Sequence, residues 1–449
     1  MSSFWRNAAW RFALHTTMLA AFPPWAWSQT LSKSDRDFAQ SMLQNVAEDV
    51  EKHYYDPKLH GVDWDARIQE AKKNIAAADS MGSAISEVAA VLDTLKDSHT
   101  AFIPPPRTNI HDYGFRLAMV GDRCLITRVV PGSDAEKKGL KLGDRILAVD
   151  DHPVTRKTLE RISYIYDELR PQPGLLLTVG EDANRQHKVE VAASYRDSSI
   201  IHYYLQQGIN QRVRDVREEG HLLRARYFEK GDSILVVKIP EFAFSADEVD
   251  NILGKMRSHK GVVFDLRHNP GGYTETLDRL LGGLFQNDLK IYDRVARNST
   301  KSVSVPGRHH DAYAGRLAVL IDSASASASE LFARVIQLQK RGFVVGDHSS
   351  GSVMEAESYS HAIAVDARAY YYAVVTDADL VMTDGKTLEH VGVEPDILIL
   401  PTPQDLATQR DPALSKAVAL VGGQLTPEEA GTILPLEESQ LAGTFLTAH

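Results

Sequence analysis

The segment Arg316–Gly346 constrains the fold most, because it reads as a strand, a turn, a helix and a second strand. Residues 316–322 form a short apolar run that is typical of a buried parallel strand. Residues 331–338 have helical spacing, and 342–346 form a second apolar run. Two strands joined through a helix run parallel, so the segment predicts a strand–helix–strand unit of an α/β domain. We expect the buried side chains of its helix to be Phe332, Val335, Ile336 and Leu338.

The turn of this unit, Ser323–Glu330, alternates serine with alanine before its final glutamate. Unpaired backbone N–H groups and the helix dipole favour negative charge at such a strand-to-helix turn. A serine nucleophile that forms a tetrahedral oxyanion needs this environment. The same residues could instead only cap the helix and allow close packing. The turn is therefore a candidate site that needs support from the rest of the chain.

Composition bounds the class of protein. The 449 residues are too many for one ordinary domain and suggest two to four. A hydrophobic content of 43% and a charged content of 24% are typical of a soluble globular chain. The net charge of −10, from 50 basic and 60 acidic residues, speaks against a general nucleic-acid or anionic-membrane binder. The single cysteine, Cys124, excludes an internal disulfide and a cysteine-based metal centre, and we expect it to be buried.

The N-terminus predicts export. Arg6 and Arg11 precede the apolar stretch 12–22, and Ala26-Trp-Ser28 offers small residues at a cleavage point. The apolar stretch is too short to span a bilayer comfortably, so residues 1–28 are interpreted as a cleaved secretory signal. The predicted location is the periplasm, with secretion as the alternative. Peripheral membrane association is compatible with this interpretation.

Residues 29–107 are predicted to form a helical domain. Apolar residues recur at helical spacing over 38–54, 64–75 and 85–95, and Ser83 is a candidate N-cap of the third helix. The third helix is followed directly by Lys96-Asp-Ser-His-Thr100, and then by a run of three prolines.

Residues 110–195 combine strand patterning with turn glycines, and 126–150 closely resemble a PDZ domain. The resemblance rests on the Pro131-Gly-Ser turn and on Gly143-Asp-Arg-Ile-Leu. It implies binding of an extended peptide at a sheet edge, with its C-terminal carboxylate held by a loop of N–H groups. By position, Tyr113, Gly114, Phe115, Arg116 and Leu117 would be that loop; they could equally be an ordinary first strand.

Residues 196–404 are predicted to form the α/β core, with 196–230 as a polar connector. A buried strand over 261–267 is followed by His268-Asn-Pro-Gly-Gly272. The glycine pair can approach a ligand closely and point N–H groups at it, so it is an oxyanion-hole candidate. Further along, 362–375 suggest a hairpin, and 405–449 a polar helical tail with a flexible end.

Three motifs in this order resemble the C-terminal-processing and tricorn-like serine peptidases: Asp265–Gly272, Ser325–Glu330 and Gly392–Ile397. The resemblance extends from about residue 38 to 400. It implies a helical N-terminal region, a PDZ domain and an α/β core of the crotonase or Clp type with parallel strands in its sheet. It also implies that Ser327 is the nucleophile.

The chain departs from one branch of this group. The C-terminal-processing branch uses a serine–lysine dyad, and Ser352 stands where that lysine would be. The tricorn-like branch instead has a Ser-His pair upstream and a glutamate downstream. Ser98-His99 and Glu389 match that pattern, so the chain is closer to the tricorn-like branch.

The resemblance assigns a complete set of roles. His99 would be the general base, supported by Ser98 and Glu389, and the N–H groups of Gly272 (or Gly271) and Ala328 would hold the oxyanion. Hydrolysis of this kind needs no metal or other cofactor. The expected partner is a protein or peptide substrate, bound through its C-terminus by the PDZ domain or gated by it; a homo-oligomer is compatible with the sequence.

Two alternatives remain open at this point. The missing lysine favours an inactive relative that binds peptides through its PDZ domain. A serine–lysine dyad could instead use a lysine outside the motif, Lys340 or Lys386.

Overall fold

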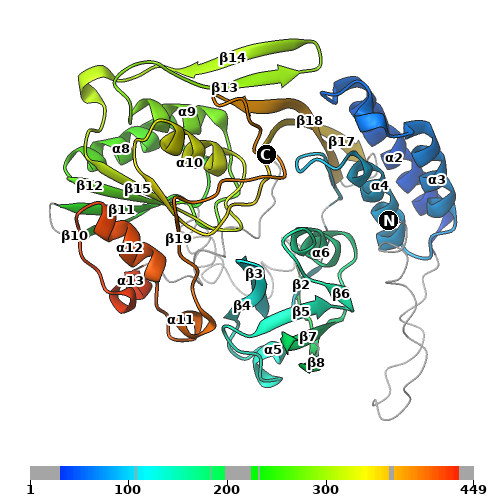
Figure 1. Cartoon of the computed structure of the whole chain (residues 1–449). Helices are drawn as coiled ribbons and strands as arrows, with labels where there is room; N and C mark the ends of the chain where they lie inside the picture. Colours follow the sequence, from blue (N-terminus) through cyan, green and yellow to red (C-terminus); the bar gives the residue numbers. More distant parts are fainter. Residues whose placement is uncertain are drawn as a thin grey trace. The chain divides into compact units, whose positions relative to one another are not determined.

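A computed structural model describes residues 31–433, except 106, 108, 183, 198–223, 231–232 and 364–368 (Figure 1). The predicted signal and most of the predicted connector lie outside the described residues. The chain divides into two compact units. The first contains the described residues up to 105 together with 161–172 and 356–377, and the second contains the remainder. No helix of the described ranges is long and apolar enough to cross a membrane.

The first unit contains the three predicted helices, α2 (Lys33–His53), α3 (Trp64–Ala76) and α4 (Met81–Leu92). The third helix begins earlier than predicted, because Ser80 and not Ser83 caps it: the Ser80 hydroxyl accepts the Ser83 N–H. The 3₁₀ turn Asp93–Leu95 then leads into β1 (Ala101–Ile103). The helices pack through fully buried apolar residues that include Met42, Leu43, Val46, Val50, Ile75, Val88 and Leu92.

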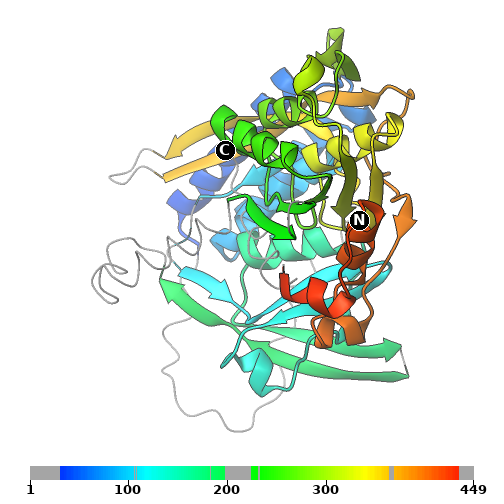
Figure 2. The same ribbon diagram turned by 90° about the vertical axis from the view of Figure 1, so that its left-hand side faces the viewer.

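The predicted PDZ region is an antiparallel sheet with short helices (Figure 2), and all of it except residues 161–172 belongs to the second unit. Its strands follow the order β3-β4-β5-β7-β8, with β6 paired to β5. Their bounds are β3 (Phe115–Val120), β4 (Arg123–Val129), β5 (Arg145–Val149), β6 (His152–Pro153), β7 (Gly174–Asp182) and β8 (Arg185–Ala192). The helices are α5 (Asp134–Lys137) and α6 (Leu159–Ser163), the π-helix Tyr164–Leu169 continues α6, and β2 (Asn109–Asp112) pairs with β9 (Ser194–Asp197). Cys124 is buried, as predicted.

A six-stranded sheet with the order β10-β11-β12-β15-β16-β19 forms the core. β10 is antiparallel to β11, and the other neighbours are parallel. The bounds are β10 (Arg226–Lys230), β11 (Ile234–Lys238), β12 (Gly261–Asp265), β15 (Arg316–Ile321), β16 (Phe343–Gly346) and β19 (Ile397–Leu398). The predicted strand–helix–strand unit is therefore β15, α10 (Ala328–Leu338) and β16. Of its predicted buried residues, only Leu338 is partly exposed.

Helices cover both faces of this sheet (Figure 1). Leu317, Val319 and Ile321 of β15 pack on one face with α8 (Ala246–Arg257), α9 (Thr274–Gly282) and α10. Ala318 and Leu320 point to the other face, against α12 (Pro412–Leu420). Strands buried on both sides are nearly continuous apolar runs, which is why the pattern could be recognised in the sequence. The mixed α/β fold class is thus confirmed.

The predicted polar tail is partly wrong. The segment is helical, with α11 (Pro403–Ala407), α12 and α13 (Pro427–Ile433). However, Leu414 and Val418 of α12 are fully buried against the core sheet, so 405–433 belong to the core. Residues beyond 433 lie outside the described part of the chain.

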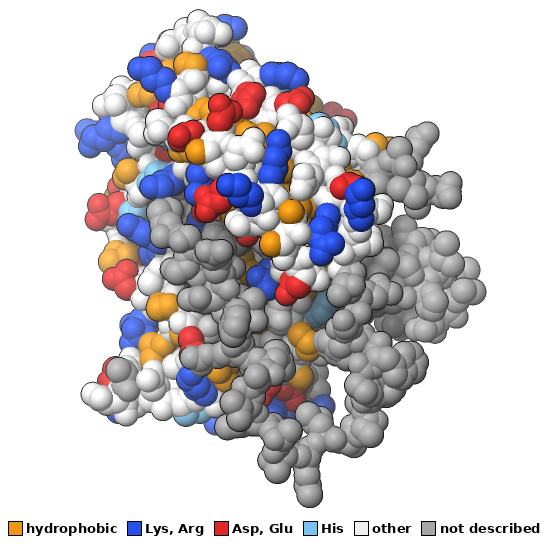
Figure 3. All heavy atoms as spheres, turned by 90° about the vertical axis from the view of Figure 1, so that its right-hand side faces the viewer, with side chains coloured by type: hydrophobic (Ala, Val, Ile, Leu, Met, Phe, Trp, Pro, Cys, Tyr) orange, Lys and Arg blue, Asp and Glu red, His pale blue; other side chains and the backbone are white. Residues whose placement is uncertain are grey.

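A second sheet contains β13 (Leu289–Ala296), β14 (Ser299–Val305), β17 (Met354–Ile363) and β18 (Ala369–Met382). The predicted hairpin is formed by β17 and β18, which are longer than expected. β18 pairs through residues 372–374 with β1 and through 378–382 with β13. On the face shown in Figure 3, basic and acidic side chains are intermixed, in keeping with a modest net charge.

Candidate active site

Ser327 occupies the turn between β15 and α10, directly before the first residue of the helix. Its backbone has a φ of 54° and a ψ of −118°, a region that residues with a Cβ rarely adopt. The Ser327 N–H donates to the Ser352 carbonyl (2.8 Å) and to Glu330 Oε2 (3.1 Å). Backbone strain of this kind persists only where neighbouring contacts enforce it, and it concentrates at functional sites.

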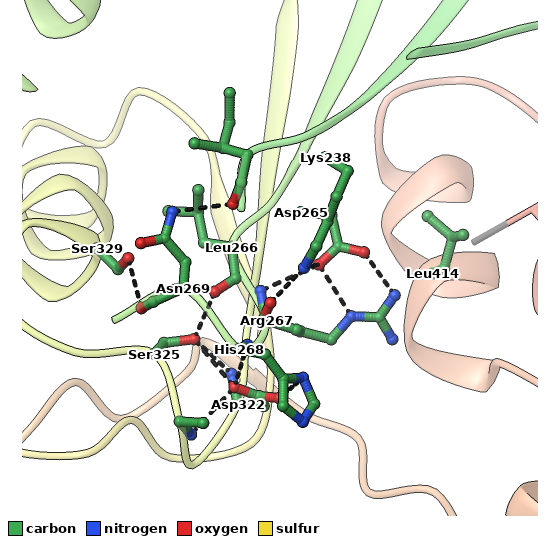
Figure 4. A network of polar contacts seen from close by, with 12 residues as sticks. Lys238, Asp265, Leu266, Arg267, His268, Asn269, Asp322, Ser325, Ser329 and Leu414 are labelled. Carbon is green, nitrogen blue, oxygen red and sulfur yellow. Dashed lines mark hydrogen bonds and ion pairs between the residues drawn. The ribbon is translucent and has the colours of Figure 1, made fainter. Parts of the chain in front are cut away.

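Asn269 connects the glycine loop to the serine turn, and sequence reasoning gave it no role. Its buried side-chain amide donates to the Ile239 carbonyl (2.9 Å), and its Oδ1 accepts the Gly271 N–H (2.8 Å). The Asn269 carbonyl accepts the Ala326 N–H (2.9 Å) and the Ser329 hydroxyl (3.0 Å; Figure 4). These contacts fix the loop after β12 against the turn that carries Ser327.

Gly271 lies against Ser327, and neither position of the glycine pair has room for a side chain. Gly271 has a φ of 110° and Gly272 a φ of 134°. A Cβ on Gly271 would lie 2.6 Å from the Ser327 Cβ, and one on Gly272 would lie 2.6 Å from the Phe242 carbonyl oxygen. The Gly271 N–H is already engaged by a side-chain oxygen. Within the described residues no hydrogen bond uses the N–H of Gly272 or Ala328, so these two are the better donors for an oxyanion.

A buried ionic network supports the strand end that precedes the glycine loop (Figure 4). Asp265 accepts two hydrogen bonds from the Arg267 guanidinium (3.0 and 2.6 Å) and one from Lys238 Nζ (3.4 Å). Arg267 also pairs with Asp411 at 2.7 Å. Burial alone would raise the pKa of Asp265, but Arg267 and Lys238 outweigh it and hold that pKa well below its usual range. The network therefore keeps Asp265 charged and the loop anchored.

Glu330 is a buried carboxylate. From the sequence it was only the last residue of the motif Ser325–Glu330, with no role of its own. Oε1 accepts the Ser349 hydroxyl (2.6 Å) and the Gly351 N–H (2.8 Å). Oε2 accepts the Ser352 N–H (2.9 Å) in addition to that of Ser327. Burial raises the pKa of Glu330 to about 7, although the four hydrogen bonds oppose the shift. The serine-x-x-glutamate spacing is a capping-box pattern and was the available sequence signal.

Glu389 lies on the other side of the loop that Glu330 holds. Its Oε2 accepts the Val353 N–H (2.9 Å), and its side chain is only 10% exposed. The next residue, His390, donates its N–H to the Gly351 carbonyl (2.7 Å). Residues 349–353 thus contact both the turn of the predicted nucleophile and the predicted supporting glutamate.

The positions of Lys340 and Lys386 do not support the alternative in which one of them is the general base. Lys340 follows α10 and Lys386 lies in the turn after β18, and both side chains are exposed. A lysine that acts as a base requires burial or a cationic neighbour to lower its pKa. Ser352 stands, by the predicted resemblance, where the C-terminal-processing branch has its lysine, and its hydroxyl contacts the Ser350 hydroxyl at 2.8 Å.

Asp97 organises the turn that carries His99, and sequence reasoning did not identify it. Its Oδ1 accepts the N–H groups of His99 (3.0 Å) and Thr100 (2.6 Å). Its two oxygens also accept the hydroxyl hydrogens of Thr376 and Tyr54, each at 2.7 Å. The histidine is therefore held on a rigid turn.

The Ser98 hydroxyl lies 2.8 Å from His99 Nδ1. Burial lowers the pKa of His99 to about 4, although the Asp97 carboxylate opposes the shift. The ring is consequently neutral, as a general base must be, over most of the pH range in which proteins function.

The predicted residues are thus distributed over the two units. Ser98 and His99 lie in the first; Ser327, Ala328, the glycine pair and Glu389 lie in the second. Within the second unit, Phe115, Arg116 and Leu117 belong to β3, at the end of the PDZ strand order, and Tyr113 and Gly114 precede it. No group of residues suited to a metal ion occurs among those described.

Comparison with known proteins identifies two domains. Residues 233–399 match the peptidase family S41, and residues 106–167 match the PDZ domain. The resemblance predicted from the motifs is thereby confirmed.

The chain is similar to named relatives of both branches. It is 26% identical over 326 residues to the tail-specific protease of Haemophilus influenzae, covering 67% of this chain and 43% of the relative. It is 25% identical over 431 residues to tricorn protease homolog 1 of Streptomyces coelicolor, covering 88% of this chain and 36% of the relative. The chain therefore spans less than half the length of these two relatives. Among solved structures, mature CPAF superimposes with a TM-score of 0.60 at 14% identity, over 84% of this chain and 95% of that one, which supports the fold.

Proposed function

We propose that this chain, which carries a peptidase domain of family S41 behind a PDZ domain, is an exported serine endopeptidase in which Ser327 is the nucleophile and His99 the general base. The observation that carries the proposal is the strained Ser327 backbone at a helix N-terminus, together with the backbone N–H groups of Gly272 and Ala328, which have no acceptor among the described residues. An oxyanion hole is built from such groups.

The reaction follows from these roles. Ser327 Oγ attacks the carbonyl carbon of the scissile bond while its proton moves to His99 Nε2. The N–H groups of Gly272 and Ala328 stabilise the oxyanion, and the histidine then protonates the leaving amine. The same imidazole then takes a proton from a water molecule, which attacks the carbonyl carbon of the acyl-enzyme ester. As the ester bond breaks, the imidazolium gives this proton to Ser327 Oγ.

Ser98 and Glu389 complete the set. If His99 accepts a proton at Nε2, its Nδ1 must carry hydrogen, and the Ser98 hydroxyl is placed to accept it at 2.8 Å. Ser98 would in turn donate to Glu389, whose carboxylate stabilises the imidazolium through the serine. The low pKa of His99 suits this role, because the imidazole is neutral before the reaction.

The PDZ domain would bind the C-terminal tail of a protein substrate or gate its access. β3 ends the sheet order, so its outer edge is suited to addition of an extended peptide. Gly114 precedes it with a φ of 73°, and a Cβ there would lie 2.4 Å from the Ser133 Cβ. We expect Gly114→Ala to raise KM for peptides with a free C-terminal carboxylate and to leave amidated peptides unaffected; equal effects on both would refute carboxylate capture.

The decisive experiment is covalent labelling with a fluorophosphonate combined with peptide cleavage. The wild-type chain should label on Ser327, and Ser327→Ala should neither label nor cleave while melting like the wild type. His99→Ala should lose cleavage by about 1,000-fold or more. The exposed His310, 91% accessible, provides the control His310→Ala, which should remain fully active.

Other outcomes select the alternatives. Peptide binding without any labelling would favour the inactive PDZ scaffold. Full activity of His99→Ala together with loss in Lys340→Ala or Lys386→Ala would favour a serine–lysine dyad. Export is tested separately, by the N-terminal sequence of the protein recovered from the periplasm of a bacterial host.

A further inference from the structure

The loop Ser349–Val353 contacts the two halves of the proposed catalytic machinery that lie in the second unit. On one side the Ser352 carbonyl accepts the Ser327 N–H at 2.8 Å. On the other side the Val353 N–H donates to Glu389 Oε2 at 2.9 Å. The position of this loop therefore sets where the nucleophile and the supporting carboxylate lie relative to each other.

We infer that Glu330 is a positioning residue for catalysis, whose carboxylate anchors the loop 349–353 and thereby holds Ser327 and Glu389 in register. The inference rests on the proposed function. Glu330 has no acid or base role in that mechanism; it acts through the loop and through its hydrogen bond from the Ser327 N–H.

Both carboxylate oxygens of Glu330 are fully used in hydrogen bonds. Glu330 is fully buried, and its two oxygens accept four hydrogen bonds: from the Ser349 hydroxyl and the N–H groups of Gly351, Ser352 and Ser327, at 2.6–3.1 Å. Within the described residues no charged side chain forms an ion pair with it. Its charge is stabilised by these donors and by its place in the first turn of α10, where the helix dipole favours an anion.

The protonated acid accepts these hydrogen bonds less well than the carboxylate does. A hydrogen on Oε2 would face the two N–H donors of Ser327 and Ser352. A hydrogen on Oε1 would face the Gly351 N–H and the Ser349 hydroxyl; that hydroxyl already accepts the Val393 N–H at 2.6 Å and has one lone pair left for another donor. If Oε1 donates this hydrogen to the Ser349 hydroxyl, the hydroxyl no longer donates to Oε1, and the Gly351 N–H is left with the hydroxyl oxygen of the acid, which is a weaker acceptor than a carboxylate oxygen. The ionised carboxylate therefore anchors the loop more strongly than the protonated acid.

The same geometry explains the residue that replaces the lysine of the other branch. Ser352 contributes its backbone, not its side chain: its N–H binds Glu330 and its carbonyl binds Ser327. Among the described residues, its hydroxyl forms a hydrogen bond only with that of Ser350. The turn therefore serves here to place the nucleophile, while the base comes from elsewhere.

The test is Glu330→Gln, which keeps the size of the side chain and replaces two acceptor sites by an NH₂ donor. A displacement of the nucleophile by about 1 Å costs about 100-fold in rate, so we expect kcat and the fluorophosphonate labelling rate to fall by about that factor while KM changes less than threefold. Glu248→Gln is the matched control, because Glu248 occupies the same third position of α8 but is exposed. It should label at the wild-type rate.

A readout specific to the charge is the pH profile. The wild-type labelling rate should step down to a lower plateau on acidification through about pH 7, where Glu330 takes up its proton. The step should be absent in Glu330→Gln. Labelling of this variant within threefold of the wild type, or persistence of the step, would overturn the inference.

Two further measurements keep the inference decidable. If Glu330→Gln does not fold, Ser349→Ala, which removes one donor and the link to Val393, should lower the labelling rate and remain folded; an unchanged rate would refute the anchoring role. If the wild type does not label at all, the proposed function fails, and hydrogen exchange decides the anchoring separately. Glu330→Gln should then speed exchange of the 351–353 amides selectively, and unchanged exchange there would overturn it.

Discussion

Replacing Gly271 by alanine tests most directly whether the glycine loop positions the nucleophile. The new Cβ would lie 2.6 Å from the Ser327 Cβ and 3.0 Å from the Ala328 nitrogen. To reach the 3.4 Å of ordinary contact, the two Cβ atoms must separate by about 0.8 Å. The backbone would also hold a side chain at a φ of 110°, which L-residues rarely adopt.

The free-energy costs of the close contact and of the backbone strain can both be estimated. Backbone strain of this kind costs about 1–3 kcal/mol, and overpacking a close contact costs about 1–3 kcal/mol more. Because the displaced atoms belong to the proposed nucleophile, we expect kcat/KM to fall by about 100-fold, with a clear loss of thermal stability. Peptide cleavage and the melting temperature would be measured on the same preparations.

Two other glycines separate the contributions. Gly385 has a φ of 79° and open space around its Cβ, so Gly385→Ala should carry strain of about 1–2 kcal/mol without loss of activity. Gly254 lies within α8 with no atom near its Cβ, so Gly254→Ala should stabilise the protein by about 0.5–1 kcal/mol. If Gly271→Ala loses stability but cleaves peptides as fast as Gly385→Ala, the loop does not position Ser327 and the argument from the close contact is wrong.

Three further predictions concern titration, the buried ions and the thiol. Complete loss of activity on acidification should occur near pH 4, where His99 becomes charged, and not near pH 6.5. Because burial lowers the pKa of His99, the neutral imidazole is present above about pH 4 and is lost below it. A single complete loss near pH 6.5 in the pH–rate profile would contradict the burial of the ring. Asp265→Asn should destabilise the core by about 3–5 kcal/mol in urea unfolding, since Lys238 and Arg267 would remain buried without their shared carboxylate; an unchanged midpoint would show that the ions are not desolvated. Burial raises the pKa of Cys124 to about 12, so iodoacetamide at pH 8 should modify it only after unfolding, and rapid modification of the native protein would contradict this.

The architecture was accessible from the sequence because its signals are local. The apolar runs at 234–238, 261–265 and 316–321 became parallel core strands, and the regular spacing in 38–54 became α2. The glycine pair also marked its loop correctly, since only glycine tolerates the φ values of 110° and 134° found there. Amphipathic spacing was overlooked once, in α12, whose buried face joins the core.

The contacts that define the candidate site depended on residues far apart in the chain. Sequence periodicity reports which face of an element is buried, but it does not report which buried polar group satisfies which partner. Glu330 meets loop residues 19 to 22 positions away, and Asn269 meets Ser329 60 positions away. Only the tertiary structure could reveal that Gly271 donates its N–H to Asn269, whereas the Gly272 N–H has no acceptor in the part of the chain that the structure describes. The sequence by itself therefore determined the elements and the candidate residues, whereas the folded chain decided their partners, because burying a polar group forces it to find a donor or acceptor wherever the fold provides one.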